Sequence, residues 1–216
     1  MTETLGHDGG AVRSSEPRTT SFGEDHGTTL VDHLGRWLSL RRVRKAVGPV
    51  PGRSVADIGC GYRADLARQL FARAGRLLLV DVSLDPAWHS RPGVEVIEGH
   101  LPNVLGSVPT ASLDVVLCNN VLEHLWEPEL TLHELHRILR PSGTLVLNVP
   151  SWRGKTFLEL AAFRLGLAPR LEMDDHKMYY DPRDLWPLLI RAGFRPSRIR
   201  CRRHKLGLNT IAVCRR

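Results

Sequence analysis

The stretch Ser54–Leu66, SVADIGCGYRADL, contains two glycines one residue apart, with an acidic residue shortly before them. The apolar residues up to Ile58 predict a buried strand, and the residues after Gly61 predict a helix. A strand that runs into glycines and then a helix can direct backbone N–H groups at a ligand, and glycines let that ligand approach closely. Asp81 ends the next apolar run, where a carboxylate can accept both hydroxyls of a ribose. This stretch therefore predicts a loop that binds an adenosine-containing cofactor.

Asp57 separates two classes of cofactor that share such a loop. Gly59, Gly61 and Ala64 also satisfy the glycine pattern of dinucleotide-binding proteins. A carboxylate beside the loop would repel the pyrophosphate of a dinucleotide, whereas S-adenosylmethionine has no phosphate and carries an ammonium and a sulfonium group. The acidic residue therefore favours S-adenosylmethionine, and a dinucleotide oxidoreductase is the alternative.

The rest of the chain alternates short apolar runs with helical patterns. This alternation predicts parallel strands that are joined by crossover helices and buried on both faces. Residues 1–27 are mostly small or polar and are expected to form a disordered tail, so that 28–216 form one domain with an N-terminal helix at 28–47. Strands are expected at 53–59, 76–81, 93–99, 112–119, 140–150 and on both sides of the Lys-Leu-Gly turn within 194–216, and further helices at 63–75, 121–139 with an interruption near Pro128, 156–167 and 182–193.

Composition limits the partners and the location of the protein. The 216-residue chain has a net charge of +7, and its last 26 residues carry nine bases and no acid. These bases are not interleaved with aromatic residues, as a platform for stacking nucleotides would require, so a nucleic acid is not the expected partner. No apolar run is long enough to span a membrane, the N-terminus lacks the pattern of a secretory signal, and the four scattered cysteines predict free thiols. We expect a cytoplasmic monomer or homodimer.

Five segments together make the chain resemble the class I S-adenosylmethionine-dependent methyltransferases, in the branch that acts on small molecules. They are DIGCG, LLLVDVS, LDVVLCNNVLEHL, LHELHRILRPSGTLVLNVP and HKMYYDPRDLWPLLIRAGF, and the resemblance covers roughly residues 54–213. It implies an α/β fold, a Rossmann-like three-layer sandwich whose seven-stranded, mostly parallel sheet has an antiparallel last strand. It also implies methyl transfer to an oxygen or nitrogen of a small molecule, in specialised metabolism or glycan modification. An RNA methyltransferase and a non-catalytic member of the fold are the alternatives.

The resemblance also places the cofactor contacts. The glycine loop would lie under the methionine part, Asp81 would bind the ribose with Val82 beside the adenine, and Asn119 would offer its backbone carbonyl to the ammonium group. The third strand of the family usually ends in Gly-Asp; this chain has Gly99-His100, so His100 or the Leu101 amide is expected to make that contact. The expected cofactor-binding residues are Asp57, Gly59, Cys60, Gly61, Asp81, Val82, Gly99, His100, Leu101 and Asn119.

Two histidines are the candidate catalytic bases. A hydroxyl or protonated amine acceptor must lose a proton, and the imidazoles of His124 and His176 titrate in the pH range that this role needs. The simpler alternative is that His124 packs beside the cofactor and that His176 lies in a polar loop. Relatives that methylate quinol precursors bind a divalent metal with a Glu-His pair and a further acid, but this chain has Asn120 where that acid would sit, so no metal is expected. The acceptor is expected to contact Glu123, Trp152, Arg153, Tyr179 and Tyr180.

Overall fold

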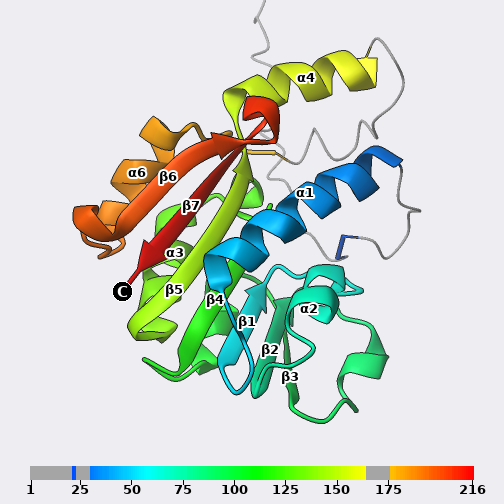
Figure 1. Ribbon diagram of the computed structural model, residues 1–216, viewed down its shortest axis with the longest axis vertical. Helices are drawn as coiled ribbons and strands as arrows, with labels where there is room; N and C mark the ends of the chain where they lie inside the picture. Colours follow the sequence, from blue (N-terminus) through cyan, green and yellow to red (C-terminus); the bar gives the residue numbers. More distant parts are fainter. Residues whose placement is uncertain (1–20, 23–29, 164–175) are drawn as a thin grey trace, which may run out of the picture.

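The computed structural model describes residues 21–22, 30–163 and 176–216, without the side chains of 30–37 and 158–163. Seven strands form one sheet in the order β3-β2-β1-β4-β5-β7-β6 (Figure 1). β1 to β5 are mutually parallel, and β7 runs antiparallel to both of its neighbours. The sheet expected from the sequence, with its antiparallel last strand, is confirmed. The strands are β1 (Ser54–Ile58), β2 (Arg76–Asp81), β3 (Val94–Glu98), β4 (Leu113–Asn119), β5 (Leu139–Pro150), β6 (Ile199–His204) and β7 (Asn209–Arg215).

Helices cover both faces of this sheet. On one face lie α1 (Leu30–Val47) and α2 (Asp65–Leu70), and on the other lie α3 (Pro128–Ile138) and α6 (Pro182–Arg191) (Figure 1). α4 (Trp152–Phe163) follows the carboxyl end of β5 and projects beyond the edge of the sheet. The three-layer arrangement expected for the class is therefore present, and it brings the carboxyl ends of β1, β2 and β4 to a common edge.

The strands contribute to two apolar clusters because successive side chains point to opposite faces. Val55 of β1 belongs to the cluster that contains Val43 of α1. Ile58 of the same strand belongs to the cluster that contains Leu135 of α3 and Leu189 of α6. Burial on both faces explains why these strands read as continuous apolar runs in the sequence.

The helix expected at 121–139 is divided into two elements. A short 3-10 helix, η3 (Leu122–His124), is followed by α3, which begins at Pro128. Proline lacks the N–H that an inner helical residue would donate, but no such bond is needed in the first turn, so it begins a new helix here. The division keeps η3 close to the end of β4.

The helix expected at 63–75 is also shorter and ends at Leu70. The chain must leave the helix early because the residues before β2 pair with those before β1. The Gly75 N–H donates to the Arg53 carbonyl, and Pro51 forms a bridge with Ala74.

Ser21 and Phe22 lie in the segment that was expected to be disordered, yet both are placed against the domain. The Ser21 side chain is buried, and the Tyr62 N–H donates to the Phe22 carbonyl over 3.0 Å. The expected tail at 1–20 and 23–27 lies outside the described residues. No helix in the described part of the chain combines the length and hydrophobicity needed to cross a membrane. All four cysteines are free, as expected.

Candidate cofactor and acceptor site

The glycine loop after β1 depends on a backbone conformation and a close contact that only glycine tolerates. Gly59 has φ +68°, and a Cβ added to it would lie 2.2 Å from Cγ2 of Val121. Gly61 has φ +75°, and its added Cβ would lie 3.1 Å from the Phe22 carbonyl oxygen. The end of β4 therefore packs directly on the loop, and the described N-terminal residues lie over it.

The N–H groups of the loop make hydrogen bonds within the protein. Those of Gly59 and Cys60 both donate to the Val80 carbonyl, over 2.7 and 3.3 Å, and that of Gly61 donates to Oδ2 of Asp81 over 2.7 Å. The sequence-based expectation that this loop directs its N–H groups at a ligand is wrong for these three residues. The loop consequently lacks the free donors that cradle a pyrophosphate.

Asp57 is buried behind the loop with an exposed fraction of 1%. Burial, and then the nearby Asp81 carboxylate, raise the pKa of Asp57 from 3.8 to about 7. Its Oδ2 has no hydrogen-bond partner among the described residues. A buried carboxylate in this state is stabilised by a cation and repels a phosphate. The site thus fits a positively charged, phosphate-free cofactor.

Asp81 ends β2 beside the loop, as expected for a ribose-binding carboxylate. Its Oδ1 accepts the Val82 N–H over 2.8 Å and also lies within hydrogen-bond distance of the Ser21 hydroxyl. Ser21 also contacts the Ser83 carbonyl and N–H. The hydroxyl of Ser21 therefore uses the Asp81 oxygen that, under the expected ribose-binding role of Asp81, would be open to a ribose hydroxyl. Sequence reasoning missed Ser21, because nothing in a polar N-terminal segment indicates where it docks.

We expect Ser21→Ala to tighten cofactor binding about fivefold, because removing one competing hydrogen bond from Asp81 is worth about 1 kcal/mol. Isothermal titration calorimetry with S-adenosylmethionine measures this change. Asp81→Ala is the opposing control and should weaken binding by about 1–3 kcal/mol. Weaker binding by Ser21→Ala would instead show that the serine hydroxyl helps to hold the cofactor.

The end of β3 offers a less complete match to the expected adenine contacts. Gly99 has φ +149°, and His100 is exposed, whereas Leu101 packs against the core. The acid nearest this turn in the sequence is Glu98, which ends β3. Its Oε1 accepts the Leu84 N–H over 2.6 Å, so this carboxylate fixes the loop after β2.

The two candidate bases come together although they lie 52 positions apart in the sequence. The ring centroids of His124, in η3, and His176 are 4.8 Å apart. His176 Nδ1 lies 3.1 Å from the Tyr179 hydroxyl. The Lys177 N–H donates to the Glu123 carbonyl over 2.6 Å, which ties the two segments to each other. Two imidazoles and a phenol thus gather near the carboxyl end of β4.

The remaining expected acceptor contacts divide into accessible and buried groups. Trp152 is exposed, its ring centroid lies 5.7 Å from that of Tyr179, and its Nε1–H donates to Asp184. Arg153 is also exposed. Tyr180, by contrast, belongs to the apolar core, so its ring does not line an open acceptor surface.

Glu123 is buried beside the two histidines with an exposed fraction of 1%. Burial raises the pKa of its carboxyl from 4.5 to about 8, so this group is largely protonated at neutral pH. It is therefore mostly a neutral acid, whose Oε2 has no hydrogen-bond partner among the described residues, and not an anion that would attract a cationic substrate.

The structure also brings together three side chains of types that bind metal ions. The ligand atoms of Glu123, His124 and His176 lie within 4.8 Å of one another. The sequence did not suggest His176 as a third ligand, because it follows far along the chain. The prediction that no metal is bound stays a prediction.

We expect EDTA to leave both methyl transfer and the thermal unfolding temperature unchanged. If EDTA lowers methyl transfer or the unfolding temperature, and adding one divalent metal restores it, the expectation that no metal is bound is contradicted.

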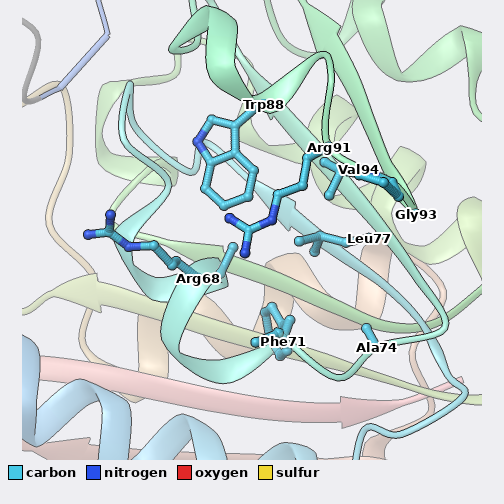
Figure 2. A pocket seen from close by; sticks show the side chains of 11 residues that line it. Arg68, Phe71, Ala74, Leu77, Trp88, Arg91, Gly93 and Val94 are labelled. Atoms are coloured by element: carbon cyan, nitrogen blue, oxygen red, sulfur yellow. The ribbon is translucent and has the colours of Figure 1, made fainter.

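A separate hollow lies between α2 and the amino ends of β2 and β3 (Figure 2). Phe71, Leu77 and Val94 line it, and the Arg91 guanidinium carbon lies 4.9 Å from the centre of the Trp88 ring. Leu77 and Val94 stand at the starts of their strands, whereas the glycine loop follows the end of β1. This hollow is therefore distinct from the candidate site.

Comparisons with known proteins point to methyltransferases. Residues 56–147 match a family described as a methyltransferase domain. A probable S-adenosylmethionine-dependent methyltransferase of Mycobacterium tuberculosis is 36% identical over 150 residues, which are 66% of this chain and 48% of that protein. The chain thus spans about half the length of this relative.

Two relatives carry more specific names. The ubiquinone biosynthesis O-methyltransferase of Bordetella avium is 27% identical over 76% of this chain and 70% of its own length. The tRNA U34 carboxymethyltransferase of Methylococcus capsulatus is 31% identical over 88% of this chain and 59% of its own length. The fold matches the crystal structure of an S-adenosylmethionine-dependent methyltransferase from Archaeoglobus fulgidus, with a TM-score of 0.61, 17% identity, and coverage of 84% of this chain and 94% of that one.

Proposed function

Because the chain belongs to the class I S-adenosylmethionine-dependent methyltransferases, we propose that it transfers a methyl group to an oxygen or nitrogen of a small molecule. Bound S-adenosylmethionine supplies a methyl group on a positively charged sulfur, which makes the methyl carbon electrophilic. The protein must orient the acceptor, exclude water and remove a proton from a hydroxyl or protonated amine.

One observation carries this proposal beyond the cofactor: the ring centroids of His124 and His176 lie 4.8 Å apart, with the two rings tilted by 57°, near the carboxyl end of β4. Paired imidazoles there suit an acceptor whose proton must be removed, since one ring can take the proton while the other orients the acceptor. The Tyr179 hydroxyl near His176 Nδ1 can fix the orientation of that ring. Trp152 offers an exposed aromatic ring beside Tyr179, and the next residue, Arg153, is an exposed cation.

The test is an acceptor survey with radiolabelled S-adenosylmethionine. The protein is incubated with two fractions of a bacterial lysate, small molecules and total RNA. We expect label in a small-molecule product that mass spectrometry identifies by a gain of one methyl group. Label in RNA alone, with a salt-dependent mobility shift on RNA, would contradict the proposal and favour the alternative, an RNA methyltransferase.

Once an acceptor is known, His124→Asn and His176→Asn are expected to lower kcat by about 10²–10⁴ and to leave cofactor affinity unchanged, because they remove a base and its partner. His133→Asn is the matched control, since His133 is an exposed histidine on α3 outside the cluster. Full activity in both cluster variants would show that the acceptor needs no base from this pair, as for a carboxylate acceptor.

A further inference from the structure

Asn148, near the end of β5, is buried, and both its side-chain amide and its backbone carbonyl form hydrogen bonds. Its exposed fraction is 1%. Its Nδ2 lies 3.0 Å from Oδ1 of Asn119 and 3.0 Å from Oδ1 of Asn120. The Asn120 N–H donates to the Asn148 carbonyl over 2.7 Å. One residue of β5 thus holds the last residue of β4 and the residue that follows it. A buried amide with its donors satisfied costs the fold little.

His204 at the end of β6 fixes the orientation of this amide. Its Nε2 lies 2.7 Å from Oδ1 of Asn148, and both side chains are buried. Because the Asn148 Nδ2 is directed at two oxygens, its Oδ1 must accept, so His204 carries its proton on Nε2. Burial, with help from nearby Lys205, Arg42 and Arg202, lowers the pKa of His204 to about 4, so the ring stays neutral near neutral pH.

The end of β4 is a demanding position, which explains why it needs such support. Asn120 has φ +55°, a left-handed conformation that strains the backbone of a residue other than glycine. The turn there directs Val121 onto the glycine loop, where the Val121 methyl leaves no room for a Cβ on Gly59. The position of Asn119 relative to that loop therefore depends on what holds the turn.

We propose that Asn148 is a positioning residue for cofactor binding: it fixes the backbone of Asn119 and Asn120 against the glycine loop, and His204 locks its amide in the orientation that does so. This inference rests on the proposed use of the Asn119 carbonyl by the cofactor's ammonium group and is independent of the acceptor. In this proposal neither Asn148 nor His204 touches the cofactor. Their effect passes through the turn after β4.

The test measures cofactor affinity without any acceptor. Asn148→Leu keeps a similar volume and removes all three side-chain hydrogen bonds. Isothermal titration calorimetry with S-adenosylhomocysteine should show about tenfold weaker binding for this variant, and in turnover the KM for S-adenosylmethionine should rise while kcat at saturation stays near the wild-type value. His204→Gln keeps an N–H donor and should restore near-normal affinity, whereas His204→Leu should resemble Asn148→Leu.

Thr210→Val is the matched control, because Thr210 is equally buried on the neighbouring strand β7 and its hydroxyl has no hydrogen-bond partner among the described residues. It should leave cofactor affinity unchanged.

Wild-type affinity in a folded Asn148→Leu would overturn the proposal. A lower unfolding temperature with unchanged Kd and KM would also overturn it, because that result would show that Asn148 has a purely structural role. If wild-type protein fails to bind S-adenosylhomocysteine, the cofactor assignment fails instead. If His204→Gln behaves like His204→Leu, the role of the histidine as a donor is overturned. Should Asn148→Leu not fold, Asn148→Ser, which is smaller and retains one donor, is measured in its place against the same criteria.

Discussion

The Gly59→Ala variant is expected to unfold at a temperature about 5–15 °C below that of the wild-type protein, and to show no measurable cofactor binding. The left-handed backbone, φ +68°, accounts for about 1–3 kcal/mol of this loss. A further 1–3 kcal/mol or so comes from the clash between the new Cβ and the Val121 methyl, 2.2 Å away. Differential scanning calorimetry measures the unfolding temperature, and calorimetric titration measures binding.

Gly52→Ala separates the two contributions. Gly52 has φ +74°, and nothing lies within 4 Å of an added Cβ, so this control reports backbone strain alone. Val121→Ala in the Gly59→Ala background should recover the part of the loss due to the clash, which a double-mutant cycle isolates as a coupling energy. Equal destabilisation by Gly59→Ala and Gly52→Ala, with no coupling to Val121, would show that the loop and the end of β4 are not in firm contact.

Cofactor affinity is expected to fall about tenfold between pH 8 and pH 6. Asp57 has a pKa of about 7 because it is buried and lies near Asp81, so it becomes protonated over this interval and loses its attraction for a cation. At pH 8 the carboxylate is mostly ionised before binding, whereas at pH 6 binding must first release its proton. Titrations in buffers of different ionisation enthalpy measure that proton release directly.

Two controls test the assignment to Asp57. Asp57→Asn should bind weakly at every pH, with the slope removed. The neutral ligand methylthioadenosine should bind the wild-type protein with little dependence on pH, because it has neither an ammonium nor a sulfonium group. A slope that persists in Asp57→Asn would assign the titration to another group.

Asp57→Asn is expected to raise the free energy of unfolding of the protein without cofactor. The pKa of Asp57 is raised on folding from 3.8 to about 7, so its contribution to stability is fully present below pH 4 and is lost as the pH rises through 7. The gain from Asp57→Asn should therefore grow between pH 4 and pH 7 and then level off, at about 2–4 kcal/mol. Urea denaturation at pH 5 and pH 8.5 measures it, and no gain at the higher pH would contradict the buried charge.

The sheet could be predicted from the sequence because each buried strand is visible there as a short run of apolar residues. The run Leu77–Val80 is apolar throughout, since both of its faces are covered, and the glycines after β1 mark the turn by their type alone. Asp57 and Asp81 could be singled out for the same reason: each is an acid at the end of an apolar run. Periodicity and residue type are local properties, so they identify elements and the residues at their ends.

What the sequence could not supply depends on register and on long-range docking. Asn148 reads as an ordinary polar residue in a strand until β5 is paired with β4, which places it opposite Asn119. Ser21 gives no sign that it docks on Asp81. The direction of the loop's N–H groups is set by the Val80 carbonyl on the next strand, so the expectation drawn from the glycine pattern alone was wrong there.

That internal use of the loop's donors limits what protein engineering can achieve with this domain. Removing the carboxylate of Asp57 would eliminate the repulsion of a pyridine nucleotide, but it would release none of the amides that such a ligand needs. Conversion would require the backbone between Ile58 and Tyr62 to detach from the neighbouring strand and turn outward. The amides of Gly59 and Cys60 are held by a main-chain carbonyl, so no side-chain replacement at Asp57 or Asp81 frees them.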